Sequence, residues 1–198
     1  MKTIAKAVQS EINIKKSKFI CSLFPTKNKK ESKEVIRRLN DEYNDATHNC
    51  TAYIVSDGEG FDDNGEPGGT AGKPMINVLR KNDLHNVTAI VTRYFGGIKL
   101  GAGGLVRAYS KSVLEAINNA EILEVELYDV YNLSFEYNNI KIVDNEIRNN
   151  NLEVIDKEYS DKVIYNIVSK DNRDIKKIFE KYQEKIAIKY KNKELLIK

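Results

Sequence analysis

The sequence predicts an α+β protein of two domains, with a boundary near Leu127. All eleven glycines lie within residues 58–104, and all three prolines lie within residues 25–74. Glycine serves backbone positions that need a positive φ or a close approach, and proline serves fixed bends. Irregular, shape-specifying loops therefore belong to a first domain over residues 1–126, and plain repeating secondary structure fills a second domain over residues 127–198.

The first domain alternates strands and helices with two glycine-rich loops. Asn28, followed by Glu31 three residues later, is typical of a helix N-terminus. Pro74 fits the first turn of another helix, because the amide hydrogen that it lacks is not needed there. The predicted elements are β-type runs over 4–24, a helix over 28–43, a strand over 50–55, a loop over 56–72, a short helix from 74, a strand over 87–94, a loop over 96–104, a helix over 104–120 and a strand beginning at 121.

The second domain has a β-α-β-β-α-β order. Ser160 and Asp161 separate two apolar-leaning runs in the manner of a hairpin turn, and Ile175, Ile178 and Phe179 keep helical spacing. The predicted strands cover 128–135, 152–159, 162–168 and 186–190, and the predicted helices lie around 140–147 and 175–182. This order is that of a ferredoxin-like unit.

Composition indicates an ordinary globular protein of the cytosol. The 41% hydrophobic and 31% charged residues argue against disorder, and the net charge of +3 argues against a histone-like protein while allowing a local basic patch. No apolar run approaches the length of a membrane span, the N-terminus lacks the features of a secretory signal, and no membrane partner is expected. Cys21 and Cys50 lie in apolar-leaning runs, which indicates buried free thiols in a reducing compartment.

The first glycine loop does not match a nucleotide-binding loop. A phosphate-cradling loop needs glycine, four residues, and then Gly-Lys-Ser/Thr. Gly72 and Lys73 are present, but Pro67 replaces the first glycine and Pro74 replaces the hydroxyl residue that contacts magnesium. The spacing therefore disfavours a nucleotidase.

Acidic and metal-type residues near this loop have competing interpretations. Asp62, Asp63 and Glu66 can gather a hard cation through oxygen ligands, although solvated acids of a turn are the favoured interpretation. His48 and Cys50 would face the same way on a strand, and Cys50 can form a nucleophile-base pair with His48 or His85. No third orienting group is evident, however, and a packed histidine is favoured. We predict no catalytic residue, no metal site and no cofactor.

The second glycine loop joins a strand to the start of a helix. Free amides and the helix dipole favour an anion at such a position, and nearby cations can converge on it. Alternatively, the glycines only allow the strand and the helix to pack closely, and the basic groups are solvated. The residues predicted to contact phosphate or nucleic acid are Lys73, Arg93, Lys99, Gly101, Gly103, Gly104 and Arg107, with His48 and Tyr94 in supporting positions.

Two long motifs resemble the signature of the IMPACT family, most closely its bacterial YigZ-like branch. They are separated by a predicted helix and strand, and Gly68 departs from the pattern at a position where a serine is expected. The motifs are Asp62-Asp63-x-Gly65-Glu66-Pro67-x-Gly69-Thr70-Ala71-Gly72-x-Pro74 and Arg93-Tyr94-Phe95-Gly96-Gly97-x-Lys99-Leu100-Gly101-x-Gly103-Gly104-Leu105-x-Arg107-Ala108-Tyr109, and the stretch Ala46-Thr47-His48-Asn49-Cys50 is also similar.

The resemblance implies an N-terminal domain of the left-handed β-α-β kind that a ribosomal protein shares with domain IV of elongation factor G. It implies a C-terminal ferredoxin-like domain similar to the last domain of that factor, in agreement with the order found above. Eukaryotic relatives regulate translation by competing for the activator scaffold of a starvation-responsive kinase. RNA or ribosome binding is the common suggestion for the bacterial branch.

The sequence therefore predicts a non-catalytic, cytoplasmic protein that binds RNA, the ribosome or a translation factor and regulates translation. One alternative is an enzyme acting on a nucleotide or a phosphorylated small molecule. Another is a protein–protein adaptor whose acidic loop, with Asp62, Asp63 and Glu66, faces a basic partner. The leading hypothesis requires the two glycine loops to form one positively charged groove with accessible main-chain amides.

Overall fold

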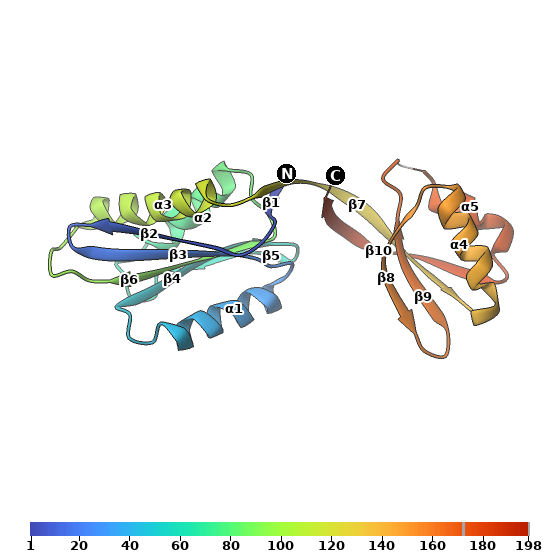
Figure 1. Ribbon diagram of the computed structural model, residues 1–198, viewed down its shortest axis with the longest axis horizontal. Coiled ribbons are helices and arrows are strands. Elements are labelled where there is room, and N and C mark those ends of the chain that lie inside the picture. Colours follow the sequence, from blue (N-terminus) through green and yellow to red (C-terminus); the bar gives the residue numbers. More distant parts are fainter. Residues whose placement is uncertain (172, 198) are drawn as a thin grey trace. The chain divides into compact units, whose positions relative to one another are not determined.

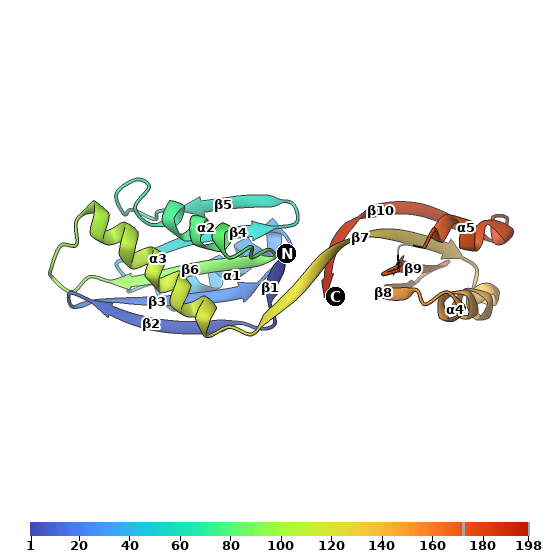
Figure 2. The same ribbon diagram turned by 90° about the horizontal axis from the view of Figure 1, so that it is seen from above.

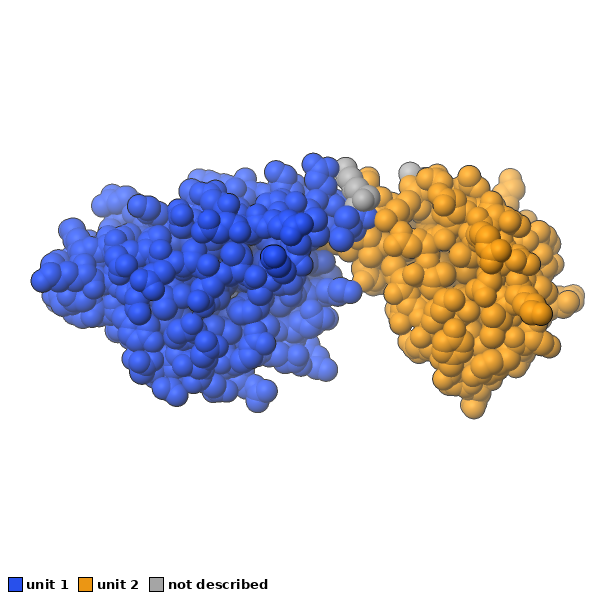
Figure 3. Space-filling model, in the orientation of Figure 1, with its two compact units in different colours: residues 1–125, 197–198 blue, residues 126–196 orange. Residues whose placement is uncertain are grey.

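The chain folds into two units, each with its own hydrophobic core. The computed structural model describes residues 1–171 and 173–197. Unit 1 comprises residues 1–125 and Ile197, and unit 2 comprises residues 126–196 (Figure 3). Within the described residues, no helix is both long enough and apolar enough to cross a bilayer.

Unit 1 is a five-stranded antiparallel sheet with helices on both faces. Its sheet consists of β2 (Val8–Ile14), β3 (Ser17–Pro25), β4 (His48–Val55), β5 (Gly58–Asp62) and β6 (Val87–Tyr94), in the order β2-β3-β6-β4-β5. Its helices are α1 (Lys29–Glu42), α2 (Gly72–Lys81) and α3 (Ala102–Asn118). Figure 1 shows α1 on one face and α2 and α3 on the other, and Figure 2 shows β2 and β5 at opposite edges. A short strand, β1 (Lys2–Ile4), pairs with the start of β7 (Ile122–Phe135).

The central strand β6 is buried on both of its faces from Val87 to Arg93. Helices on both sides of the sheet exclude water, so its polar side chains need protein partners. The hydroxyl of Thr88 lies 2.7 Å from that of Thr26 and 2.6 Å from that of Ser32. Because β6 is buried as far as Arg93, the strand places this side chain in the interior, shortly before the second glycine loop.

The predicted start of the first helix is confirmed. The side chain of Asn28 accepts a hydrogen bond from the amide of Glu31 at 2.9 Å, and the Glu31 carboxylate accepts one from the amide of Lys27 at 2.7 Å. These bonds satisfy amides that have no partner inside the helix.

Unit 2 has the predicted β-α-β-β-α-β order of elements. After β7 come η1 (Tyr137–Asn139), α4 (Ile140–Asn149), β8 (Glu153–Tyr159), β9 (Val163–Val168), α5 (Ile175–Phe179), η2 (Glu180–Tyr182) and β10 (Ile186–Ile197). The strand order is β10-β7-β9-β8, with antiparallel pairing of β9 to both β7 and β8. The helix predicted around residues 175–182 is a short α-helix, α5, that continues as the 3₁₀ turn η2.

Three predicted boundaries are wrong. The last strand, β10, runs from Ile186 to Ile197 rather than ending at residue 190. Residues 56–72 are not all loop, because β5 pairs there with β4. Strand β5 contains Gly58 and Gly60, and glycine disfavours strands. A Cβ at Gly60 would lie 2.5 Å from the Tyr53 hydroxyl, so glycine at this position leaves room for the tyrosine ring to cross the strand. The strand predicted to begin at residue 121 and the strand predicted over 128–135 are one continuous strand, β7. Its start pairs with β1 and its end pairs with β9.

Candidate functional site

The first glycine loop is closed around the carboxylate of Asp63. Its oxygens accept hydrogen bonds from the backbone amides of Gly69, Ala71 and Gly72 at 2.6, 3.0 and 2.8 Å. Partial burial by itself raises the pKa of this carboxyl, but the three amides favour the charged form, and the net effect is a lowered pKa. Contrary to the expectation of a solvated acid, Asp63 holds the loop in its shape.

Replacing Asp63 with asparagine is expected to lower the free energy of unfolding at neutral pH by about 2 kcal/mol, because a neutral oxygen accepts weaker hydrogen bonds than a carboxylate. The folded pKa lies below the unfolded value of ~3.9, so the stabilisation is present above that value and is lost as pH falls through the folded pKa. Urea unfolding of both proteins across the acidic range checks this prediction.

The stability difference between Asp63→Asn and the unaltered chain should shrink as the solution is acidified, and a difference independent of pH contradicts the assignment. Asp62→Asn is the matched control. Asp62 is exposed and accepts the amide of Asn64 at 2.7 Å, so its replacement should cost less at neutral pH.

Glu66 is the buried centre of a polar network that joins the first loop to three other elements. Its side chain is 3% exposed. One carboxylate oxygen accepts hydrogen bonds from Arg93 of β6 at 2.5 Å and from the Tyr109 hydroxyl of α3 at 2.7 Å. The other oxygen lies 3.9 Å from Nε2 of His48 on β4. The expectation of a solvated acid is therefore wrong for Glu66 as well.

Cys50 and His48 do not form a hydrogen-bonded nucleophile-base pair. The Cys50 thiol donates to the carbonyl of Asp63 at 3.0 Å and lies 3.3 Å from the Tyr109 hydroxyl, while Nδ1 of His48 lies 2.8 Å from the carbonyl of Asn64. Burial raises the pKa of Cys50 to about 12, against a smaller lowering by the Tyr109 hydroxyl, so the residue is a thiol at neutral pH.

Across the described chain, no three His, Cys, Asp or Glu side chains are grouped to hold a metal ion.

An open groove of about 440 Å³ lies beside the Glu66 network, and both glycine loops line it. Glu66 and Pro67 come from the first loop, and Phe95 and residues 99–102 come from the second loop and its borders. We call it the glycine-loop groove. Its lining residues are Thr47, His48, Glu66, Pro67, Arg93, Phe95, Lys99, Leu100, Gly101, Ala102 and Leu105.

The N-terminus of α3 contributes the free amide of Ala102 to one wall of this groove, and Gly103 and Gly104, which follow it in the helix, are not among the lining residues. The helix begins after Gly101, whose φ of 72° favours glycine and which has no side chain to cap the helix. Among the described residues, the amides of Ala102, Gly103 and Gly104 have no hydrogen-bond partner. Open space surrounds Gly101 and Gly103. These amides and the helix dipole make the wall attractive to an anion.

Arg93 is held rigidly at the groove rather than extended into solvent. Its guanidinium lies over the rings of Phe19 and Phe95, at 5.4 and 5.5 Å from their centroids. Nη1 is paired with Glu66, whereas Nε is enclosed and unpartnered, and Nη2 forms no hydrogen bond within the described chain. The buried strand β6 carries this side chain, so the arginine predicted to contact phosphate is buried and ion-paired. Arg93 offers an oriented donor instead.

The other residues of the predicted set divide between the groove and its surroundings. Lys99 lines the groove, is exposed, and has no ion-pair partner in the described part of the chain. Lys73 and Arg107 are exposed but lie outside the groove lining. The Tyr94 hydroxyl donates to Asp45 at 2.8 Å, and this side chain also lies outside the lining.

Sequence reasoning overlooked Thr47 and the polar role of Tyr109. The Thr47 hydroxyl accepts the amide of Phe95 at 2.9 Å and so attaches the second loop to the start of β4. The hydroxyl of Tyr109, a residue of the second motif, donates to Glu66. Both residues lie in stretches that resemble the family signature, and that resemblance was the available indication.

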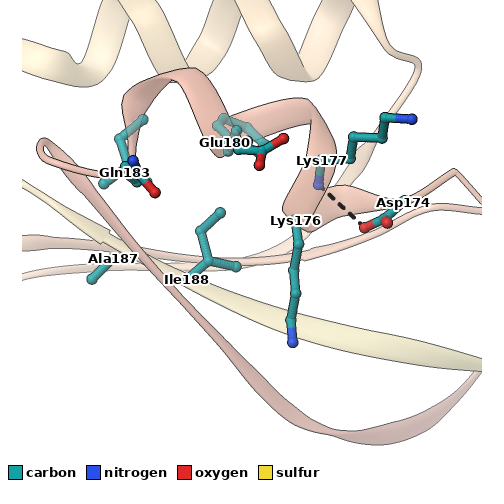
Figure 4. A pocket seen from close by; sticks show the side chains of 9 residues that line it. Asp174, Lys176, Lys177, Glu180, Gln183, Ala187 and Ile188 are labelled. Atoms are coloured by element: carbon teal, nitrogen blue, oxygen red, sulfur yellow. Dashed lines mark hydrogen bonds between the residues drawn. The ribbon is translucent and has the colours of Figure 1, made fainter.

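A larger cavity, of about 700 Å³, lies in unit 2. Figure 4 shows it between β10, with Ala187 and Ile188, and the helical turns that carry Glu180 and Gln183. Its lining includes none of the predicted site residues. Size alone therefore does not make it the candidate site.

The fold and the groove define a two-unit protein of mixed helices and strands, with a groove lined by two glycine loops. The Impact N-terminal domain model matches residues 15–117, and the chain belongs to the IMPACT family. It is 42% identical to the IMPACT family member YvyE of Bacillus subtilis, over 81% of this chain and 76% of that protein. It is 39% identical to the IMPACT family member YigZ of Escherichia coli, over 64% of this chain and 65% of that protein. A crystal structure of a hypothetical protein is similar to 94% of this chain, and to 95% of its own, with a TM-score of 0.73 at 30% identity.

Proposed function

We propose that this chain is a non-catalytic, translation-associated protein that binds RNA through the glycine-loop groove. The observation that carries the proposal is the meeting of both glycine loops in one groove beside an uncapped helix N-terminus. Free amides, the oriented guanidinium of Arg93 and the unpaired ammonium of Lys99 form a set of donors suited to phosphate oxygens. The exposed ring of Phe95 adds a surface on which a base can stack.

The link to translation comes from the family. We assign unit 2 to the ferredoxin-like fold and compare it with the last domain of elongation factor G. The order of its elements and the strand order β10-β7-β9-β8 support that assignment. We likewise assign unit 1 to the left-handed β-α-β kind, and the connection of β3 to β4 through α1 supports it. Ribosomal RNA, or a translation factor bound to RNA, is the expected partner.

The acidic loop does not support the hypothesis of a protein–protein adaptor. It requires the carboxylates of Asp62, Asp63 and Glu66 to face a basic partner. Asp63 is bound to three amides of its own loop, and Glu66 is buried against Arg93. Asp62 is the exposed carboxylate of the three, so the loop presents little negative charge.

Binding of single-stranded RNA is expected to weaken as salt concentration rises, because each protein cation that contacts a phosphate releases bound counterions. Lys99→Ala should weaken binding and lower the slope of log affinity against log salt by about 0.7 to 1. Fluorescence anisotropy at several salt concentrations measures both quantities. Lys99 is preferred over Arg93 for this test, because the exposed lysine can be removed without breaking a buried ion pair.

Lys111→Ala is the matched control, since Lys111 is an exposed lysine on α3 about 15 Å along the helix axis from Gly101. It should leave the slope unchanged. RNA affinity that is indifferent both to salt and to Lys99→Ala removes the phosphate-contact claim. Turnover of a nucleotide, together with a magnesium-dependent rise in melting temperature, would instead favour an enzyme acting on a phosphorylated small molecule.

A further inference from the structure

The glycine-loop groove has more donors for phosphate oxygens than an internal RNA linkage can use. Ala102, which lines the groove, and the next two helix residues, Gly103 and Gly104, have amides without a partner among the described residues, and Lys99 adds an exposed ammonium to the lining. An internal phosphodiester has one negative charge and two unbridged oxygens. A phosphate monoester has three terminal oxygens and a charge of about −1.5 to −2 at neutral pH. The donor set therefore fits a monoester better than a diester.

Arg93 is the second, independent indication of an anionic ligand. Its side chain is 6% exposed, yet Nη1, bonded to Glu66, is the one guanidinium nitrogen with a hydrogen bond in the described chain. Buried donors nearly always have acceptors, and a guanidinium that lacks them bears a desolvation cost. The rings of Phe19 and Phe95 hold the group in place. An oxygen that enters the groove therefore meets an oriented Nη2, the guanidinium nitrogen that is neither enclosed nor bonded to Glu66.

The groove also has an apolar part beside these donors. Pro67, Leu100 and Leu105 line it, and the ring of Phe95 is 46% exposed. The volume of about 440 Å³ falls within the ~300–1,000 Å³ of sites that bind small ligands. Stacking on an aromatic ring stabilises a base regardless of its sequence. A groove of this size suits one nucleoside and its phosphate, and it does not suit the broad backbone of a duplex.

We propose that the glycine-loop groove binds a nucleoside phosphate monoester at the end of an RNA chain. The phosphate lies against the α3 amides, Arg93 and Lys99, and the base lies against Phe95. This inference rests on the proposed function, which supplies RNA as the polymer, and adds that the protein recognises a phosphorylated terminus rather than internal linkages. The same chemistry occurs in a free nucleotide, and the test separates the two sources.

The test compares the full chain binding one short single-stranded RNA with a 5′-phosphate, a 3′-phosphate or hydroxyls at both ends. A phosphorylated end should bind at least about 10-fold more tightly than the hydroxyl form. UMP should compete for the groove, whereas uridine should not.

If UMP binds and no RNA does, the ligand is a free nucleotide, and the proposed RNA function fails while the monoester site stands. Equal affinity for all three RNAs overturns the monoester inference and leaves RNA binding intact.

Ala102→Pro tests the amide contact without removing a side chain. Ala102 is the first helical residue, where proline is well tolerated, and the exchange deletes one of the free amide hydrogens. It should weaken binding of the phosphorylated RNA about 10-fold and leave the hydroxyl form unchanged. Phe95→Leu should weaken UMP binding more than it weakens binding of inorganic phosphate, because the base loses its ring while Phe19 still holds Arg93, and Lys111→Ala should alter neither. Unchanged UMP affinity in both Ala102→Pro and Phe95→Leu contradicts the proposed placement of the ligand.

Discussion

Glu66→Leu is expected to lower the free energy of unfolding by about 3–5 kcal/mol, because it leaves the guanidinium of Arg93 charged, buried and without its partner. The Tyr109 hydroxyl loses its acceptor in the same variant. Urea unfolding of the folded chain measures the loss. A change below about 1 kcal/mol would show that water reaches Arg93 and that the network is not a stabilising element.

A double-mutant cycle separates the ion pair from simple loss of packing. Arg93→Met alone should also be strongly destabilising, because it leaves the carboxylate of Glu66 buried. The combination of Glu66→Leu with Arg93→Met should cost much less than the sum of the single changes, since an apolar pair replaces two charges. Glu59→Gln, which breaks the exposed pair between Glu59 and Arg80, is the surface control and should leave stability nearly unchanged.

Gly96→Ala is expected to destabilise the chain by about 3 kcal/mol or more, because a Cβ at this position would overlap backbone atoms. It would lie 1.9 Å from the carbonyl oxygen of Lys16 and 2.5 Å from the amide nitrogen of Ser17. Neither segment can move freely, since β3 is paired with β6 and the Ser17 hydroxyl accepts the amide of Gly96 at 3.2 Å. Denaturant unfolding measures the loss.

Gly68→Ala provides the matched control in the first glycine loop. A Cβ there would meet no atom within 4 Å, and the backbone is not in the left-handed region. Its stability should equal that of the unaltered chain or exceed it slightly, through reduced freedom of the unfolded state. Equal effects at Gly96 and Gly68 would mean that the second loop does not pack against the turn between β2 and β3.

Features set by residues close together in the sequence were predictable. The cap at Asn28 depends on a residue three positions away, and the helical and strand periods of unit 2 are local patterns. The glycine-rich motifs also indicated where the chain must form loops. The prediction that both loops contribute to one site agrees with the lining of the groove.

Features set by distant residues were not predictable from one sequence. Glu66 and Arg93 lie 27 positions apart, and the sequence shows only an acid in one loop and a base before another. Their burial follows from the central place of β6, which depends on the whole sheet. Strand β5 was missed for a similar reason, because Tyr53 of the neighbouring strand makes its glycines necessary. The prediction that Arg93 contacts phosphate did not include its burial against Glu66, which follows from this long-range packing.

The most direct test of the central claim follows backbone amide and arginine Nε signals by NMR while 5′-phosphorylated single-stranded RNA is added to the isotope-labelled full chain. The account predicts that the largest shift changes occur at the amides of Ala102, Gly103 and Gly104 and at Nε of Arg93. Changes confined to other surfaces, such as the surface of α1 that carries Lys29, Lys30 and Lys33 or the cavity of unit 2, would contradict it.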